Sequence, residues 1–488
     1  MRVAEIIAGM AVRRSSEADP EVSGITFNSR QVKPGDLFVA LTGQRFDGRA
    51  FVPDALERGA VAVLAAGDPP EEFQGLWLTT AEPRWLMGPI AARIFGHPER
   101  DLLIAGVTGT NGKSTVVHIL ESILNAADIP SGCMGTLGYR FKDEVYPGER
   151  TTPESADLYR TFRKMRDAGA EAVCMEVSSH GLEQGRVEGL SFDLAIFTNL
   201  SRDHFDFHHG FEDYFSAKRK LFERLKSDGW AVVNLDDPYG RRMAAGLPQV
   251  VTFGKEGDVR VLRAELDSKG IRADLATPRG SLSIQSPLLG GYNLENLLAA
   301  VAGGEALGLP VAALVQGIAD RPPLSGRMEP IECGQPFPVL LDYAHTDAAL
   351  EAALRSLKEF SRRKVLLVFG CGGDRDTGKR VLMGRVAGEL ADFSIITSDN
   401  PRREDPLEII ASIEEGLKES GASDYRILPD RREAIRRAVG QAEAGWAILI
   451  AGKGHEEVQI LGDQELPFSD RKEMRRVLEE RFGSRPTG

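Results

Sequence analysis

The sequence is poor in cysteine, and its few cysteines are far apart. Its 488 residues include only four, which are Cys133, Cys174, Cys333 and Cys371. None of them has a neighbour at the spacing of metal ligands. Reduced thiols are therefore expected, and these are typical of a cytoplasmic protein.

Long apolar runs and an excess of positive charge are also missing. No run of about 18 apolar residues is long enough to cross a bilayer, and residues 1–5 bring in charge before any apolar core forms. We expect neither a membrane partner nor a signal peptide. The 60 basic residues stand against 72 acidic ones, a net charge of −12, which argues against general nucleic-acid binding.

The remaining composition is that of a soluble globular protein, with 42% hydrophobic and 27% charged residues. At about 100–200 residues per domain, this length predicts about two to four domains.

A glycine-rich segment, residues 106–115, is the most informative stretch. It reads Gly-Val-Thr-Gly-Thr-Asn-Gly-Lys-Ser-Thr between an apolar run and an apolar-periodic segment, which predicts strand, loop and helix. Backbone N–H groups and the positive end of a helix suit a triphosphate. Lys113 would reach the β and γ phosphates, and the hydroxyl of Ser114 or Thr115 would help to hold Mg²⁺. An ordinary glycine-rich turn is the alternative, but Gly-Lys-Ser at this place is more specific.

Residues 1–98 carry short apolar strands separated by turns. A helix is predicted from near Pro83, with proline in its first turn, to near Gly96. Two polar segments, 28–30 and 43–48, could contact a ligand. Taken alone, each is better explained as an ordinary polar turn.

Strands and helices alternate from residue 99 to 325, which predicts a parallel sheet covered on both faces. The strand candidates are residues 102–107, 172–177, 194–198, 230–235 and 250–253, with a β-like stretch at 258–288 and a helix at 293–301. Ligands bind beyond the carboxyl ends of such strands. Three polar segments, 108–115, 176–180 and 199–204, follow strands there and predict one site.

Residues 321–327 contain two prolines and a glycine and predict a hinge. A second α/β domain follows it, with strands at 339–341, 365–369, 394–397 and 447–450 and helices at 347–359 and 406–419. Its polar segments at strand ends are 342–345, 370–376, 399–402 and 452–456.

Three side chains have more than one interpretation from the residues alone. Glu176 is a carboxylate suited to Mg²⁺, but a glutamate at a strand end can also cap a neighbouring loop. A lone histidine such as His204 is more often structural than a ligand. Lys218 would be a solvated helix lysine on its position alone.

Seven motifs in order make the whole chain resemble the Mur ligases of peptidoglycan synthesis. They are residues 108–115 (TGTNGKST), 176–180 (EVSSH), 199–204 (NLSRDH), 293–296 (NLEN), 326–327 (GR), 342–345 (DYAH) and 452–456 (GKGHE). Residues 151–153, 370–376 and 399–402 are similar to those of the family members that add 2,6-diaminopimelate.

The resemblance implies an α/β protein of three domains. Residues 1–98 would form a small N-terminal α/β domain for the UDP moiety. Residues 99–325 would form a central P-loop ATPase with a mostly parallel sheet, and residues 326–488 a Rossmann-like α/β domain for the amino acid. The implied enzyme is an ATP-dependent amide ligase that joins meso-2,6-diaminopimelate to UDP-N-acetylmuramoyl-L-alanyl-D-glutamate through an acyl phosphate. A cytoplasmic monomer is expected, with these small molecules as its partners and ATP and Mg²⁺ as its cofactors.

The resemblance also implies roles for individual residues. The catalytic residues would be Lys113, Glu176, His204 and Lys218, and Mg²⁺ would be served by Ser114, Glu176, His204 and a carbamylated Lys218. The nucleotide would be bound by Gly109, Thr110, Asn111, Gly112, Lys113, Ser114, Thr115, Asn293, Arg327 and Asp342. The UDP-dipeptide would be held by Ser29, Gln44, Arg45, Phe46, Thr151, Thr152, Ser178, Gln184 and Arg186. Diaminopimelate would be held by Arg375, Asp399, Asn400, Pro401, Arg402, Gly452 and Glu456.

Two kinds of alternative stay open. One is another amide ligase of the superfamily, which adds lysine here or glutamate to folate; residues 399–402 favour diaminopimelate, and the first domain argues against folate. The other is a P-loop kinase or nucleotide switch, which has no need of Arg375, Arg402 and Glu456 beside an amino acid. Arg150 departs from the asparagine that is common at this position in the family.

Overall fold

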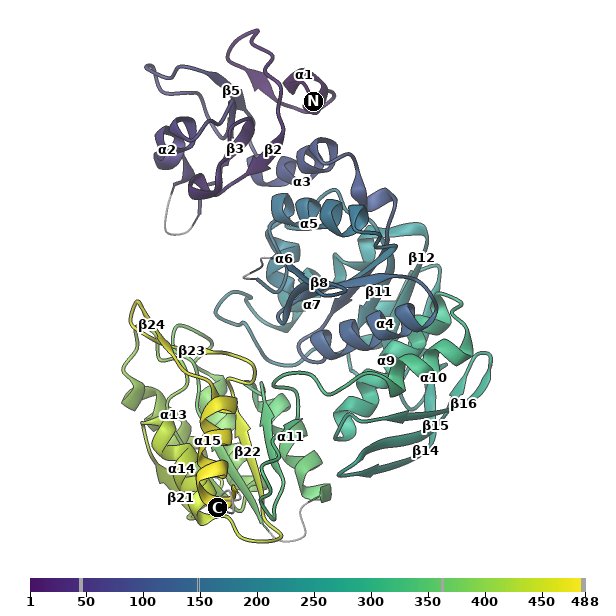
Figure 1. The fold of residues 1–488 in the computed structure, drawn as a ribbon, viewed down its shortest axis with the longest axis vertical. Helices are drawn as coiled ribbons and strands as arrows, with labels where there is room; N and C mark the ends of the chain where they lie inside the picture. The colour runs from purple at the N-terminus through teal and green to yellow at the C-terminus, as the bar shows by residue number, and fades with distance from the viewer. Residues whose placement is uncertain (44–46, 147, 149, 361–363, 484–488) are drawn as a thin grey trace, which may run out of the picture.

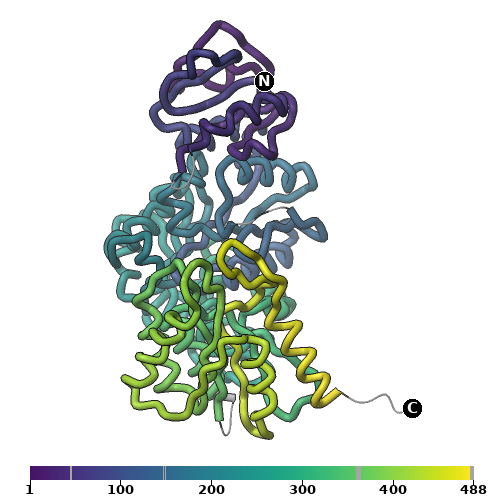
Figure 2. The backbone as a smooth tube through the Cα atoms, turned by 90° about the vertical axis from the view of Figure 1, so that its left-hand side faces the viewer, coloured from purple at the N-terminus to yellow at the C-terminus, as the bar shows by residue number. Residues whose placement is uncertain are grey.

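Three α/β units follow one another along the long axis of the molecule (Figure 1). The computed structural model describes residues 1–43, 47–146, 148, 150–360 and 364–483. The tube view shows the same order from the side, with the N-terminal unit at one end (Figure 2). No helix within these described ranges has the length and apolar character needed to span a membrane.

The N-terminal unit is a five-stranded sheet with strand order β1-β5-β4-β3-β2. Its strands are β1 (Arg13–Arg14), β2 (Gly24–Thr26), β3 (Asp36–Ala40), β4 (Ala62–Ala65) and β5 (Leu76–Thr79). Its helices are α1 (Val3–Ile6), α2 (Val52–Glu57) and α3 (Pro83–Ile94), with 3-10 turns at Ser29–Gln31, Gly48–Phe51 and Pro98–Arg100. The predicted strands and the proline-initiated helix are confirmed.

An eight-stranded sheet with strand order β13-β12-β11-β6-β10-β7-β8-β9 forms the central unit. Its strands are β6 (Leu103–Thr108), β7 (Ser131–Gly135), β8 (Gly138–Phe141), β9 (Glu144–Tyr146), β10 (Ala172–Glu176), β11 (Phe192–Phe197), β12 (Leu225–Asn234) and β13 (Val250–Phe253). The strands from β13 to β7 are parallel, and β8 and β9 add an antiparallel edge. The predicted, mostly parallel sheet is confirmed.

Helices cover the central sheet, and a small antiparallel sheet lies beside it. The helices are α4 (Lys113–Ala126), α5 (Ser155–Asp167), α6 (Ser179–Glu183), α7 (Phe211–Arg219), α8 (Gly240–Ala244), α9 (Gly291–Ala306) and α10 (Val311–Ala319), with a 3-10 turn at Phe222–Arg224. The small sheet comprises β14 (Arg260–Asp267), β15 (Gly270–Thr277) and β16 (Gly280–Ser286).

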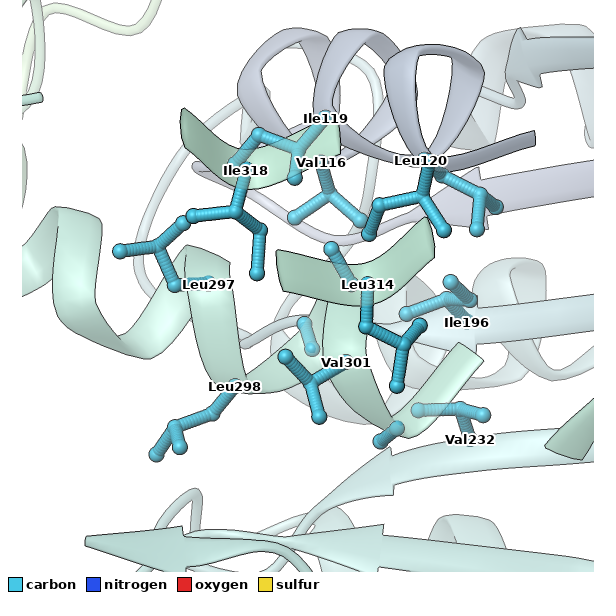
Figure 3. Close-up of a cluster of buried hydrophobic side chains, with 14 of the residues drawn as sticks. Val116, Ile119, Leu120, Ile196, Val232, Leu297, Leu298, Val301, Leu314 and Ile318 are labelled. Atoms are coloured by element: carbon cyan, nitrogen blue, oxygen red, sulfur yellow. The ribbon is translucent and has the colours of Figure 1, made fainter. Parts of the chain in front are cut away.

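A buried apolar cluster fixes helix α4, whose first residue is Lys113 (Figure 3). Apolar side chains of α4 pack there against side chains of α9, α10 and the sheet. The cluster includes Val116, Ile119 and Leu120 of α4, Ile196 of β11, Val232 of β12, Leu297, Leu298 and Val301 of α9, and Leu314 and Ile318 of α10, all at most 4% exposed. Truncation of such a leucine or isoleucine to alanine costs about 2–5 kcal/mol. The cluster therefore holds the start of α4 in place.

The C-terminal unit is a six-stranded sheet with strand order β17-β18-β22-β19-β20-β21, parallel except for β17. Its strands are β17 (Glu329–Pro330), β18 (Val339–Asp342), β19 (Val365–Phe369), β20 (Phe393–Ile396), β21 (Tyr425–Ile427) and β22 (Ala447–Ala451), and a separate hairpin joins β23 (Val458–Leu461) to β24 (Gln464–Pro467). Its helices are α11 (Asp347–Phe360), α12 (Lys379–Leu390), α13 (Pro406–Glu419), α14 (Arg431–Gln441) and α15 (Asp470–Phe482). The four predicted strands and two predicted helices are confirmed, and the boundaries at 98/99 and 325/326 stay predictions.

Candidate active site

The glycine-rich segment forms a tight loop between β6 and α4, as predicted. Gly109 has φ 151° and Gly112 has φ 86°, a region that favours glycine. A Cβ atom on Gly109 would lie 1.9 Å from Thr198 Oγ1, and one on Gly112 would lie 2.3 Å from Asn296 Oδ1. Both glycines are therefore required by backbone conformation and by close neighbours.

The segment after β11 holds this loop from the other side. Asn199 accepts hydrogen bonds from two loop amides, Asn111 N to Oδ1 at 2.9 Å and Thr110 N to the carbonyl at 2.9 Å. Thr198 Oγ1 donates to Asn111 O at 2.6 Å. The structure thus brings together the first and third polar segments.

Lys113 folds back over the loop that precedes it. Its Nζ donates to the carbonyls of Gly109 at 2.8 Å and Thr110 at 2.9 Å. Burial lowers the pKa of Lys113, and the nearby Glu176 carboxylate acts in the opposite direction. The ammonium group lies over the cradle of N–H groups where a phosphate would bind.

Glu176 lies beside this loop and is nearly fully buried. Its Oε1 accepts from Ser114 Oγ at 2.7 Å and from Thr136 N at 2.8 Å, and Oε2 accepts from Thr136 Oγ1 at 3.2 Å. One carboxylate and two hydroxyls at the phosphate loop form an oxygen donor set of the kind that Mg²⁺ prefers. The residues present therefore fit this ion. The contacts to Thr136 also show Glu176 capping the segment after β7, which was the alternative interpretation.

His204 lies at the end of the third segment with a left-handed backbone, φ 57°. Its Nε2 is 3.3 Å from Asp203 Oδ2, and burial lowers the pKa of the ring to about 3. The imidazole is therefore neutral, the form that can accept a hydrogen bond or bind a metal. Its ring is 4.7 Å from that of His180, so the second and third segments also meet.

Lys218 is buried, with 1% of the residue exposed, so its interpretation as a solvated lysine is wrong. Its Nζ lies 4.2 Å from the centroid of the Tyr214 ring. Burial, with the charge of Lys113, lowers the pKa of Lys218 well below its usual value. A neutral amine is favoured here, and a neutral amine is nucleophilic.

A cavity of about 240 Å³ opens next to the phosphate loop, between the central and C-terminal units. Arg327 and Asp342 line it, as do Asn111, Gly112 and Thr115 of the loop. Arg327 also donates to Ser114 Oγ at 3.2 Å. Asp342 is held by Tyr292 Oη at 3.0 Å and Met328 N at 2.7 Å, and burial raises its pKa.

Asn293 does not line this cavity. It is fully buried and donates to Leu289 O at 2.7 Å, so its nucleotide contact stays a prediction. Tyr292 and Asn296 line the cavity instead. Asn296 belongs to the same motif, one helical turn away on α9, so helical spacing was the signal that could have identified it.

Five predicted UDP-dipeptide residues form one cluster beside Glu176. Thr152 Oγ1 donates to Glu176 O at 3.0 Å and lies 3.1 Å from Ser178 Oγ. Arg186 donates to Thr152 O at 3.0 Å and to Gln184 Oε1 at 2.5 Å, and burial lowers its pKa to about 10. The fifth residue, Thr151, is 3.0 Å from Thr136 between their hydroxyl oxygens.

The remaining predicted contacts to this substrate lie elsewhere. Ser29 is buried in the 3-10 turn Ser29–Gln31 of the N-terminal unit. Gln44, Arg45 and Phe46 lie outside the described residues. Arg150, the residue that departs from the family pattern, pairs with Glu154 at 2.5 Å.

The predicted amino-acid residues follow three neighbouring strands, β19, β20 and β22. Asn400 donates to Glu456 Oε2 at 2.7 Å and so joins two of these segments. Arg402, with φ 52°, donates to Gly373 O at 2.7 Å and joins the third. A Cβ atom on Gly452, φ 112°, would lie 2.5 Å from Asp399 Oδ2, so glycine is required there.

Two further residues predicted to contact the amino acid lie in the same strand-end segments. Pro401 is buried, and Arg375 is exposed and donates to Asp374 O at 3.0 Å. The three strand-end segments therefore form one cluster, with both positive and negative side chains available to an amino acid.

Two charged groups behind this cluster were missed in the sequence. Lys453 is fully buried, and its Nζ donates to Asn400 Oδ1 and to Glu456 Oε2, each at 2.9 Å. Arg431 forms a fully buried ion pair with Asp470 at 2.7 Å and donates to Ala451 O at 2.9 Å. Lys453 lies inside a recognised motif, but Arg431 lies in a charged helix that gives no signal.

Comparison with known proteins decides the family. Residues 107–304 match the Mur ligase middle domain, residues 326–454 the Mur ligase glutamate ligase domain, and residues 21–74 the Mur ligase catalytic domain. The chain is 44% identical over 485 residues to a UDP-N-acetylmuramoyl-L-alanyl-D-glutamate–2,6-diaminopimelate ligase from Geobacter metallireducens, with 94% of each chain covered. The chain belongs to the Mur ligase family. It is therefore a ligase.

Solved structures of Mur ligases have the same fold. A structure of a UDP-N-acetylmuramoyl-L-alanyl-D-glutamate–2,6-diaminopimelate ligase matches with a TM-score of 0.65 and 34% identity, covering 94% of this chain and 95% of that one. The MurF ligase from Thermotoga maritima in complex with ADP matches with a TM-score of 0.68 and 19% identity, covering 95% and 97%. The three-unit α/β architecture is thus that of the Mur ligases.

Proposed function

We propose that this chain is the ATP-dependent ligase that adds meso-2,6-diaminopimelate to UDP-N-acetylmuramoyl-L-alanyl-D-glutamate in peptidoglycan precursor synthesis. Residues 1–98 would bind the UDP moiety, 99–325 ATP, and 326–488 the amino acid. The enzyme would act as a cytoplasmic monomer. The relatives named above carry this activity in their names.

One observation supports the proposal most strongly. Glu176 contacts both the phosphate loop, through Ser114 Oγ at 2.7 Å, and the substrate cluster, through its carbonyl and Thr152 Oγ1 at 3.0 Å. A carboxylate substrate in that cluster would therefore lie next to the γ-phosphate of a nucleotide in the loop. An acyl phosphate needs this adjacency.

The reaction would proceed in two steps. An oxygen of the D-glutamate carboxylate attacks the γ-phosphorus of ATP, so the bond to the β,γ-bridging oxygen breaks and ADP leaves. The amine of diaminopimelate then attacks the acyl carbon, gives up one proton and expels phosphate, leaving an amide. Lys113 and the loop N–H groups would stabilise charge on the transferring phosphoryl group. Arg186 would orient the peptide.

Ser114, Glu176, His204 and a modified Lys218 would hold Mg²⁺. When bound, the ion would neutralise negative charge on the phosphate oxygens. An ammonium group would repel it, but the buried Lys218 amine favours its neutral form. That amine can add to CO₂, releasing one proton and forming a carbamate whose oxygens are suitable ligands.

Omission assays test the proposal. Purified protein with ATP, Mg²⁺, UDP-dipeptide and meso-diaminopimelate should release equal amounts of ADP, phosphate and amide product. Leaving out either acceptor should stop sustained ADP release. Steady transfer of phosphate to the UDP-dipeptide without an amino acid would instead indicate a kinase.

A further inference from the structure

The segment that supports the phosphate loop also reaches the C-terminal unit. Asn199 holds the loop amides, and Arg202, three residues later, pairs with Asp376. The pair is bidentate, with Arg202 Nε donating to Asp376 Oδ2 at 3.0 Å and Nη2 donating to Oδ1 at 3.1 Å. Two parallel charge-assisted bonds fix orientation as well as distance.

A second set of charges lies beside this pair. Asp203 is buried, and its carboxylate oxygens lie 3.6 Å from Lys379 Nζ and 3.6 Å from His345 Nε2, both in the C-terminal unit. Asp203 of the central unit therefore faces two basic side chains of the C-terminal unit.

Asp376 lies one residue after Arg375, for which an amino-acid contact is proposed. Asp376 Oδ1 also accepts from Gly378 N at 2.9 Å, at the start of α12. The same segment is tied to the loop of Arg402, because Arg380 pairs with Glu404 at 2.8 Å and Asp374 with Arg403 at 2.9 Å. A change at Asp376 would therefore pass to both arginines of the amino-acid cluster.

Gly378 gives independent support for a close approach at this point. A Cβ atom there would lie 2.3 Å from Arg202 Nη2, although φ −65° and ψ −21° at Gly378 are ordinary helical angles. Alanine could adopt this backbone without strain. An alanine at this position would therefore push the guanidinium group of Arg202 aside.

We infer that Arg202 and Asp203, with Asp376 and Lys379, form a clamp that positions the amino-acid loop against the nucleotide loop. Arg202 and Asp376 are positioning residues for the ligation step and act through Arg375 and its neighbours. This inference rests on the proposed function, because it assigns diaminopimelate to that loop. The clamp orders the site that delivers the amine and leaves the UDP-dipeptide cluster alone.

Steady-state kinetics of full-length variants test the clamp. Arg202→Ala should raise the KM for meso-diaminopimelate about tenfold, a coupling at the low end for a partly buried interface pair. It should leave the KM for the UDP-dipeptide within about twofold. Asp376→Asn should behave likewise, and the double variant should be no worse than either single one. Arg202→Lys should raise this KM less than Arg202→Ala does, since lysine keeps the positive charge but cannot make the two parallel hydrogen bonds of a guanidinium group.

Gly378→Ala supplies a test that leaves all four charges in place. Its added methyl group should displace Arg202 and reproduce the rise in the KM for meso-diaminopimelate. Arg241→Ala, which breaks the exposed pair with Glu256, is the matched control and should match wild type.

Wild-type amide synthesis reports on the proposed function, and the ratio of variant to wild-type KM reports on the clamp. Unchanged KM values for meso-diaminopimelate in both Arg202→Ala and Gly378→Ala would overturn the inference. An equal rise in the KM of all three substrates would also overturn it, because that pattern indicates general loss of structure.

Discussion

At the nucleotide site one continuous segment supplies most of the groups, whereas at the amino-acid site the groups come from three separate loops. The phosphate loop spans residues 109–115, and its glycines present backbone N–H groups. The amino-acid cluster joins segments that follow β19, β20 and β22, through Asn400 to Glu456 and Arg402 to Gly373. The first site is built of backbone and the second of charged side chains.

This difference determines how each site tolerates change. A backbone donor survives most side-chain substitutions, so the nucleotide loop depends on its glycines and on Lys113. In the amino-acid cluster Lys453 pairs with Glu456 at 2.9 Å, and removal of one of these charges leaves the other without its ionic partner. Substitutions should therefore affect turnover at the first site and substrate preference at the second.

Lys113→Ala should give the largest effect. Loss of its charge at the transferring phosphoryl group should lower kcat by about 10²–10³-fold and leave UDP-dipeptide binding nearly intact. Turnover at saturating ATP and calorimetric titration with the UDP-dipeptide measure the two quantities. Lys164→Ala, at an exposed lysine of α5, is the control. Wild-type turnover of Lys113→Ala would refute its assigned role.

Lys218→Ala should give the second-largest effect, a loss of about 100-fold in activity through weaker Mg²⁺ binding. Short carboxylates such as acetate should restore part of it by replacing the carbamate oxygens. Lys220→Ala is the matched control, because Lys220 lies two residues away and pairs with Glu183 at 2.7 Å. Full activity of Lys218→Ala, or unmodified lysine in a substrate-bound crystal structure, argues against the carbamate.

Arg402→Ala should raise the KM for meso-diaminopimelate about 30-fold, the low end for loss of a desolvated ion pair, while the KM for ATP stays nearly constant. Arg385 of α12 is exposed and pairs with Glu419 at 2.6 Å, so Arg385→Ala should change neither constant by more than about twofold. Equal effects of the two substitutions would show that Arg402 makes no specific contact.

Much of the fold and of the nucleotide site could be predicted because their signals are local. The strand, the loop and the helix around Lys113 are continuous in sequence, and apolar runs identified strands such as β13 and β19. β7 was missed, since its sequence Ser-Gly-Cys-Met-Gly has little preference for strands, although it pairs with β10.

The amino-acid site could be predicted only in outline. The motifs identified Asn400, Arg402 and Glu456, but nothing local indicates that Arg431 meets Asp470, 39 residues away, or that Arg202 meets Asp376, 174 residues away. Such pairs depend on how helices and loops pack in three dimensions. Lys218 shows the same limit, because only the folded structure distinguishes a buried lysine from a solvated one.

A competition assay tests the central claim most directly. Wild-type protein would receive ATP, UDP-dipeptide and equal amounts of meso-diaminopimelate and L-lysine, and the two products would be separated by mass. Lysine lacks the second carboxylate that Arg402 would bind, so lysine should bind more weakly than diaminopimelate by about 2–5 kcal/mol. This difference predicts a preference for diaminopimelate of about 30-fold to several thousand-fold. Equal amounts of the two products would contradict the assignment of the amino-acid site.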